Sequence, residues 1–417
     1  TDEQKQLVKD YPFLNVNRGT VYLYLPDRLT GFLKKWDGLA EETRKRRPAD
    51  DLIHCLTENP GQAPVAKLFS RGDFQQPRDE IPPGELAILS SGAVIPVDDP
   101  GVPTTGRRLA YAHQLTSGQH PLVARVLVNR IWLHHFGRGL VATPGDFGIL
   151  GELPSHPELL DWLAAEFMSS GWLLKPLQRL IVTSATYRQS SHRRDDLDAV
   201  DSENRLLGRM SVRRLEAEVI RDSLLLTSGR LSDKLYGAPI PIMPDEVGQI
   251  VVGIDTRDSA GRPSGKVEPL GEDAFRRSLY VTVRRTLPLG MLEPFDAPVM
   301  SPNCEQRAFS TVAPQSLLMM NNTFVVDHAA AMAQRLKAEV GDDPNALIVA
   351  AWRECFGQTP SESNRAEGLA YLIEQIQFFT ANPVSNLPKD SPKDATTLAL
   401  ATLCQALTSS NAFLYVD

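Results

Sequence analysis

Residues 122–136 form a segment in which apolar side chains appear on every side of a helical wheel drawn at about 100° per residue. A helix that is apolar all round is buried. This one also carries Arg125, Asn129 and Arg130, and a buried guanidinium needs a carboxylate or several carbonyls. We therefore expect acidic partners elsewhere in the helical core, and the available ones are Asp146, Asp161, Glu216, Glu218 and Asp222.

Two adjacent histidines, His134 and His135, close this segment before Gly137 and Gly139 end the helix. Neighbouring positions on a helix point about 100° apart, so the two rings cannot face one ion. His134 shares a face with Arg130, four residues earlier. A histidine near a helix C-terminus also interacts well with the helix dipole and the last carbonyls. The pair is therefore either a structural helix end or a site that uses only one of the two rings.

The spacing of apolar residues predicts a mainly α fold, a multi-helix orthogonal bundle core with a minor β or irregular insertion. An irregular N-terminal region with short helices and a strand is expected over 1–105, and a helical core over 106–230. A loop-rich and β-rich insertion follows over 231–300, where "EVGQIVVGID" and "RRSLYVTVRRT" are typical of strands. Residues 301–417 are expected to form a C-terminal helical part that packs on the core.

Capping signals support the helices of the central region. "SHPE" predicts Ser155 as an N-cap with Glu158 three residues later. "SSGW" predicts a left-handed Gly171 after the same helix, with Trp172 folding back on it. Gly229 is expected to close the helix predicted over 213–228.

Charge and cysteine content exclude several classes of protein. The net charge of −7 argues against a nucleic-acid binder, and no apolar run reaches the roughly 18 residues that a membrane span needs. The four cysteines lie far apart and no C-x-x-C-H is present, so no metal or haem site is expected in this chain. Thr1 in place of methionine predicts a mature product or a fragment.

The segment "TPGDFGILGELPSHPELLDW" holds the candidate catalytic residues Asp146, His156 and Asp161. A neutral histidine beside carboxylates suits acid–base chemistry, provided that the loop folds over the helix. The alternative is structural: Asp146 turns the loop, His156 lies in the first helical turn, and Asp161 pairs with a buried arginine.

Polar side chains on the other predicted helices are candidate ligand-binding groups. Tyr187 and Arg188 could bind a carboxylate, a sulfate or sugar hydroxyls, or could attach a helix end to its neighbour. "RRLEAEVIRDSL" spaces its charges by three and four residues, which suits surface ion pairs or partners for the buried arginines. The candidate substrate-binding residues are Arg125, Asn129, Arg130, Tyr187, Arg188 and Arg221.

One long block of sequence carries a family resemblance. "HPLVARVLVNRIWLHHFGRGLVATPGDFGILGELPSHPELLDWLAAEFMSSGWLLKPLQRLIVTSATYRQSS" resembles the planctomycete PSD-one domain, a domain of unknown function. "RRLEAEVIRDSLLLTSGRL", "CEQRAFSTVAPQSLLMMNN" and "LCQALTSSNAFLYVD" agree with it. The family pattern includes Arg125, Asn129, Arg130, Asp146, His156, Asp161, Tyr187, Arg188, Glu218, Arg221, Asp222 and Arg307.

The resemblance implies the C-terminal part of a large exported protein, and hence an extracytoplasmic location. It also implies a cytochrome c-like domain elsewhere in the full-length protein. Any haem would be held by that N-terminal domain, because this chain lacks the haem motif. The family's association with sulfatase and polysaccharide-degradation genes suggests a polysaccharide ligand.

Two functions follow from these expectations. The first is an extracytoplasmic binding or scaffold module linked to polysaccharide processing, in which the polar residues form a buried ion-pair network. The alternative is a glycan-active hydrolase or lyase that acts on sulfated or acidic sugars, with Asp146, His156 and Asp161 around a pocket.

Overall fold

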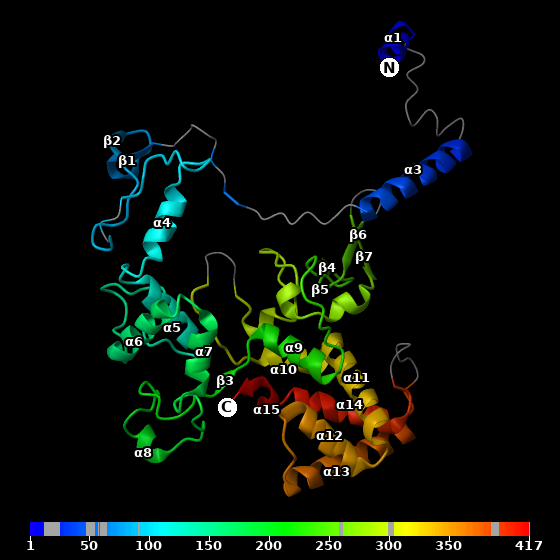
Figure 1. Ribbon diagram of the computed structural model, residues 1–417. Helices are drawn as coiled ribbons and strands as arrows, with labels where there is room; N and C mark the ends of the chain where they lie inside the picture. The colour runs from blue at the N-terminus through cyan, green and yellow to red at the C-terminus, as the bar shows by residue number, and fades with distance from the viewer. Residues whose placement is uncertain are drawn as a thin grey trace. The chain divides into compact units, whose positions relative to one another are not determined.

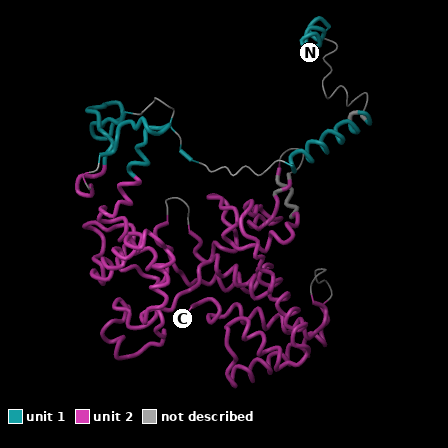
Figure 2. The backbone as a smooth tube through the Cα atoms, viewed as in Figure 1, with its two compact units in different colours: residues 1–84, 94–111 teal, residues 85–93, 112–417 magenta. Residues whose placement is uncertain are grey.

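The computed structural model describes residues 1–11, 26–46, 55–56, 58, 65–90, 92, 94–257, 262–298, 304–384 and 392–416. The chain divides into two compact units (Figures 1 and 2), one of residues 1–84 and 94–111, the other of residues 85–93 and 112–417. The described residues are mainly α-helical with small two-stranded antiparallel sheets, which confirms the predicted fold class. None of the helices described is both long and apolar enough to cross a membrane.

The first unit contains short, separate elements. Thr1 caps the first helix and accepts from the backbone of Gln4, whose side chain returns to the N-terminal amine. The elements of this unit are α1 (Asp2–Asp10), α3 (Pro26–Arg46), β1 (Ala66–Phe69), η2 (Ser70–Gly72), β2 (Pro77–Ile81) and the start of α4 (Arg107–Leu115).

The second unit opens with helices that pack around large apolar side chains. Trp132 and Phe136 stack at 4.2 Å between their ring centroids and lie in one buried cluster with Leu163, Phe167 and Ile181. Burial of each such side chain stabilises the fold by about 1.5–3 kcal/mol. The helices concerned are α5 (Val123–Phe136), α6 (Pro157–Ser169) and α7 (Leu174–Thr183), followed by the single turn α8 (Asp195–Asp198).

The middle of this unit combines short strands and 3₁₀ turns with two helices. Here β3 pairs with the C-terminal β8, so residues 213–214 lie beside residues 415–416. The elements are β3 (Arg213–Arg214), α9 (Ala217–Thr227), β4 (Ile242–Pro244), β5 (Ile250–Val252), β6 (Ile254–Arg257), β7 (Pro263–Glu268), η3 (Gly271–Phe275), η4 (Ser278–Tyr280), η5 (Glu293–Phe295) and α10 (Ala313–Asn321).

Four long helices form the C-terminal core. Helix α14 packs against α11 and α13, and the buried side chains between them include Met332, Leu336, Leu372 and Leu400. The elements are α11 (Thr323–Val340), α12 (Pro344–Phe356), α13 (Glu362–Ala381), α14 (Ala395–Thr408), α15 (Asn411–Leu414) and β8 (Tyr415–Val416).

Two local predictions were wrong. "RRSLYVTVRRT" is not a strand: it contains the 3₁₀ turn η4, and only two isolated bridges are described in it, Arg276 with Ser232 and Val281 with Ile240. Ser155 is not the N-cap of α6, because His156 holds that position without a side-chain cap. The Ser155 hydroxyl and amide both donate to the Leu140 carbonyl instead. The hydroxyl expected to cap the helix therefore bonds a residue that is distant in the sequence.

Other local predictions are confirmed. Gly171 and Gly229 have positive φ at the ends of their helices. Trp172 folds back: its amide donates to the Phe167 carbonyl, and its ring lies 5.3 Å from the Phe167 ring.

Candidate functional site

A polar cleft of about 420 Å³ lies beside the C-terminal half of α5. The helix contributes Arg130 and His134 to it. The junction of β3 and α9 contributes Arg213 and Glu216, and residues 304–309 close the other side. We call this space the arginine cleft; the side chains that line it are Arg130, Leu133, His134, Gly137, Arg213, Glu216, Pro298, Cys304, Glu305, Gln306, Arg307 and Phe309.

The end of α5 explains why these side chains meet. Arg130 and His134 are four residues apart, so they share one face of the helix, as the sequence predicts. Gly137 ends the helix with a φ of 80°, and a Cβ there would lie 2.5 Å from Cδ of Arg213. Glycine therefore lets Arg213 cross the helix end, where its Nη1 donates to the His134 carbonyl at 2.9 Å.

Two guanidinium groups in this cleft form no ion pair with a carboxylate of the described residues, although the charge of Glu216 acts on one of them, Arg213. Arg130 is half-buried, and among the described residues it has no hydrogen bond or ion pair, so the expectation of an acidic partner for it was wrong within those residues. Arg213 bonds a carbonyl, and within the same described ranges it forms no ion pair. Burial lowers the pKa of Arg213 below its ordinary value, although the group stays charged at neutral pH. The cleft thus offers two charged donors to an incoming anion.

Arg307, unlike Arg130 and Arg213, forms ion pairs with carboxylates. Its two terminal nitrogens bond the Glu218 carboxylate at 2.6 and 3.0 Å, and Nη1 lies 3.4 Å from Glu216. Burial alone would raise the pKa of Glu218, but the bonds from Arg307 and the backbone outweigh burial and lower the pKa. This pair therefore holds residues 304–309 to the start of α9.

A second cavity of about 930 Å³ shares Pro298 and residues 304–307 with the arginine cleft. Asp146 and Glu305 line it. Glu305 lies directly against Gly145, where any Cβ would overlap its carboxylate. In the part of the chain that the structure describes, no cation pairs with Glu305 or Asp146.

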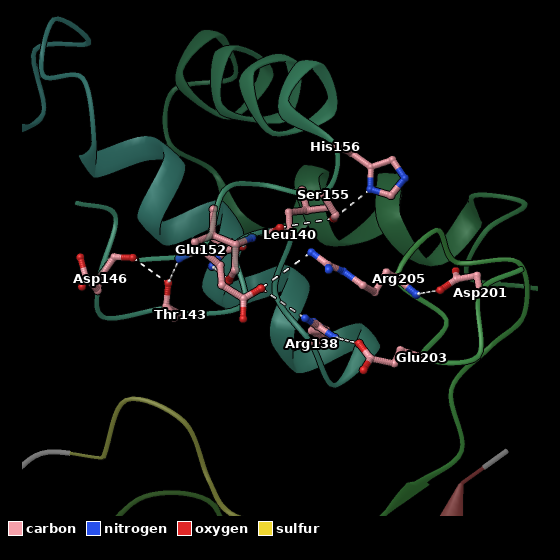
Figure 3. Close-up of polar contacts among 12 residues, drawn as sticks. Arg138, Leu140, Thr143, Asp146, Glu152, Ser155, His156, Asp201, Glu203 and Arg205 are labelled. Carbon is pink, nitrogen blue, oxygen red and sulfur yellow. Dashed lines mark hydrogen bonds and ion pairs between the residues drawn. The ribbon is translucent and has the colours of Figure 1, made fainter. Parts of the chain in front are cut away.

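The three candidate catalytic residues do not converge on one pocket. Asp146 Oδ1 accepts from the Gly148 amide, and His156 contacts Ser155 at the other end of the same loop (Figure 3). Between these two ends lies a network of ion pairs in which Glu152 meets Arg138 and Arg205 (Figure 3). Asp161 faces outward on α6 with 58% of its side chain exposed. Only Asp146 lies at a cavity adjoining the arginine cleft.

The expected partner of Arg125 is correct, but the expected burial is not. Arg125 Nε donates to Asp161 Oδ1 at 2.6 Å, and 37% of the Arg125 side chain is exposed. Its Nη1 also bonds the Pro121 carbonyl. Arg125 lies near the start of α5, where the helix reaches the surface of its unit, so this ion pair is largely solvated.

Asn129 is fully buried, and its side chain forms hydrogen bonds with the backbone of Val141. Its amide group donates to the Val141 carbonyl and accepts from the Val141 amide, both at 2.9 Å. Gly139 leaves the space for this pairing, because a Cβ there would lie 2.8 Å from the Asn129 amide atoms. The side chain therefore fixes the turn that follows α5.

Tyr187, Arg188 and Arg221 lie in separate places. The Tyr187 ring meets the rings of His135 and Phe136 edge to face. Arg188 is exposed and reaches back to the Ser184 carbonyl. Arg221 is only 1% exposed and bonds Ala274, Arg276 and Ser278. Tyr187 and Arg221 thus make the contacts of structural residues.

The two histidines face different surroundings. His134 is exposed at the arginine cleft. His135 packs on Tyr187, and burial, followed by the charge of Arg213, lowers its pKa. No cluster of three or more His, Cys, Asp or Glu side chains suited to a metal ion occurs among the described residues.

Sequence reasoning missed Arg213 and Glu305. No usable signal marked Arg213, because the sequence predicts a helix over 213–228, whereas residues 213–214 form the strand β3. Adjacent residues in a strand point to opposite faces. Arg214 is buried and bonds Asp296, so its neighbour Arg213 faces the other way, toward the cleft. Glu305 had no signal in the sequence either. Its position depends on how its segment packs against Gly145, which is distant in the sequence.

The fold and the cleft define a mainly helical protein with a polar surface site lined by arginine and glutamate side chains. A model of the family described as a protein of unknown function, PSD1 (DUF1553), matches residues 107–372, and the chain belongs to that family. No curated protein and no solved structure matches the chain.

Proposed function

We propose that the chain is a binding module whose arginine cleft holds the acidic group of a sulfated or carboxylated sugar. The observation that carries this proposal is the pair Arg130 and Arg213, two guanidinium groups at one cleft that form no ion pair with a carboxylate of the described residues. A planar guanidinium matches sulfate and carboxylate oxygens, and hydrogen bonds between charged groups are the strong ones. His134 and Gln306 add donors and acceptors for the hydroxyls of a sugar ring.

The proposal places the module outside the cytoplasm, in a longer protein that carries a cytochrome c-like domain. This part is supported by the resemblance of the central sequence block and by the anionic ligand that the cleft suits. The chain contributes the ligand-binding surface, and haem chemistry belongs to the other domain.

Titration calorimetry with a sulfated oligosaccharide and its desulfated counterpart tests the binding. We expect the sulfated form to bind more tightly, with an affinity that falls as salt rises. Arg130→Gln and Arg213→Gln should each weaken binding by on the order of tenfold or more, because a hydrogen bond to a charged group contributes roughly 1.5–3 kcal/mol.

Arg188→Gln is the matched control, since Arg188 is exposed and does not line the cleft. Equal binding of the two oligosaccharides, or equal losses in the cleft variants and the control, would show that the cleft is not the site.

A second candidate function is a glycan hydrolase or lyase at the adjoining cavity. The observation that favours it is Glu305, a carboxylate without a cationic partner in the described ranges, on the same cavity as Asp146. Carboxylates so placed can act as general acid or base. Release of reducing ends, or of an unsaturated uronic product, should then be lost in Glu305→Gln and Asp146→Asn. Asp161→Asn, on the outer face of α6, should keep full activity, and product release that survives Glu305→Gln would rule this function out.

A further inference from the structure

The arginine cleft and the adjoining cavity of about 930 Å³ share part of their walls, Pro298 and residues 304–307. We call the larger space the carboxylate cavity, after Asp146 and Glu305; residues 142–146, 296–298 and 304–308 line it. Both volumes fall in the range of small-molecule sites, roughly 300–1,000 Å³. Because the two spaces adjoin, a ligand longer than one sugar unit that is bound in the arginine cleft would extend into the carboxylate cavity.

Two charged side chains of the carboxylate cavity are already paired. The Asp296 carboxylate accepts from Arg214, and the Arg307 guanidinium donates to Glu218. Opposite charges held this close largely cancel each other's effect on a ligand. The charge that a ligand meets in this space is therefore set by the two carboxylates after which the cavity is named.

These two carboxylates are accessible to a ligand. Glu305 is exposed and Asp146 is half-buried, and within the described ranges neither of them forms an ion pair. Asp146 Oδ1 accepts from the Gly148 amide at 2.8 Å, which leaves further acceptor positions on the carboxylate for a ligand. Asp146 also lies apart from Arg138 and Arg205 (Figure 3), which pair with Glu152.

Gly145 shows on which side of the shared wall the Glu305 carboxylate lies. Glu305 borders both spaces, but its carboxylate lies directly against Gly145, where any Cβ would overlap it. Gly145 lines the carboxylate cavity and does not line the arginine cleft. Both carboxylates without an ion pair therefore belong to the larger space, whereas Arg130 and Arg213 line only the cleft.

Guanidinium groups and carboxylates select different sugar units. A guanidinium donates hydrogen bonds to the oxygens of a sulfate or a carboxylate. A carboxylate only accepts hydrogen bonds, so it binds the hydroxyls of an uncharged sugar and repels a second anion. The two adjoining spaces thus suit two unlike units of one ligand.

We propose that the ligand is a glycan in which an acidic unit stands next to an uncharged unit, with the acidic unit in the arginine cleft and the uncharged unit in the carboxylate cavity. Asp146 and Glu305 are then specificity-determining residues that reject a second acidic unit. This inference rests on the proposed binding function and adds to it the pattern of charge along the ligand.

The first experiment compares two carrageenan tetrasaccharides by titration calorimetry of the intact chain. In one of them sulfated galactose alternates with uncharged anhydrogalactose, and the other carries a sulfate on every unit. We expect the alternately sulfated form to bind more tightly, by on the order of tenfold, although it carries the smaller charge. Attraction to the arginines alone would give the reverse order. The preference should shrink as salt rises, because salt screens the repulsion.

The second experiment uses Glu305→Gln and Asp146→Asn, which keep the size of each side chain and remove its charge. Each variant should bind the fully sulfated tetrasaccharide more tightly than the wild type does. The double variant should bind it at least as tightly as the alternately sulfated one. Glu166→Gln is the matched control and should keep the wild-type preference, since Glu166 is exposed and lines neither space. A double variant with the wild-type preference would show that these carboxylates do not set the specificity.

The outcomes separate this inference from the proposed function. If neither tetrasaccharide binds, or if binding is unchanged in Arg130→Gln and Arg213→Gln, the proposed function fails and the inference fails with it. If both tetrasaccharides bind through these arginines, and the wild type binds the fully sulfated one as tightly or more tightly, the binding function stands and only the charge pattern is overturned.

Discussion

Arg214 donates from Nη2 to the Asp296 carboxylate at 2.5 Å and thereby joins β3 to the turn after η5. Asp296 has a φ of 60°, and it also accepts from the amide and hydroxyl of Ser310. The Arg214 side chain is 3% exposed, between the rings of Phe295 and Phe309. This ion pair therefore anchors both segments that lead to the arginine cleft.

Asp296→Ala should destabilise the chain by about 3 kcal/mol, because it leaves a buried guanidinium without its carboxylate. Asp296→Asn should be milder, since asparagine tolerates a positive φ and keeps one acceptor. Denaturant unfolding measures both. Asp196→Ala, in the exposed pair with Arg194, is the control and should leave the free energy of unfolding nearly unchanged. A stable Asp296→Ala chain would contradict the anchoring role.

Asn129 and Gly139 should behave as one unit. Asn129→Ala leaves the Val141 amide and carbonyl without partners and should cost about 2 kcal/mol. Gly139→Ala should also destabilise, because its Cβ would lie 2.5 Å from the Val141 oxygen. The double variant should lose less stability than the two single variants lose together. Urea unfolding of the wild type, the two single variants and the double variant measures this. Asn345→Ala, at an exposed position, is the control. Full additivity would show that the two residues act independently.

Acid should weaken the contact between α11 and α14. Burial opposes the ionisation of Asp394, but hydrogen bonds from Lys337 and Thr397 outweigh it and lower the pKa to about 2, from an ordinary 3.8. Because the folded pKa is the lower one, this stabilisation is present above pH 3.8 and is lost as pH falls toward 2. Melting temperatures should thus fall less between these pH values in Asp394→Asn than in the wild type. Asp233→Asn should follow the wild type, and an unchanged acid slope in Asp394→Asn would refute the assignment.

The four cysteines should react in two groups. Cys55 and Cys304 are exposed, whereas Cys404 is buried. Burial raises the pKa of the Cys355 thiol to about 12 and that of Cys404 well above its ordinary value. Since the thiolate is the reactive form, dithionitrobenzoate should label Cys55 and Cys304 in the native chain and all four thiols only after unfolding. Cys304→Ser should remove one fast-reacting thiol. Rapid native labelling of Cys404 would contradict the packing of α14.

Local sequence signals predicted helices around α5, α6 and α9, but the helix expected from residue 213 begins only at Ala217, after the strand β3. The apolar periodicity of α5, α6 and α9, and the glycines that follow these helices, depend on residues within a few positions of each other. Contacts with distant segments therefore do not alter them. The same kind of signal failed for "RRSLYVTVRRT", where residues from distant segments decide the conformation: Ser278 bonds Asp222, and Tyr280 bonds the Ile240 amide.

The sequence alone determined the mainly helical class and the face that Arg130 shares with His134. It could not determine which polar side chains meet, because that depends on the path of loops between elements. Asp146, His156 and Asp161 lie within one stretch of the sequence, yet the loop carries them apart. Arg130, Arg213 and Glu305 are distant in the sequence, yet they line one cleft. Side-chain convergence is a property of packing between elements, and only the tertiary structure decides it.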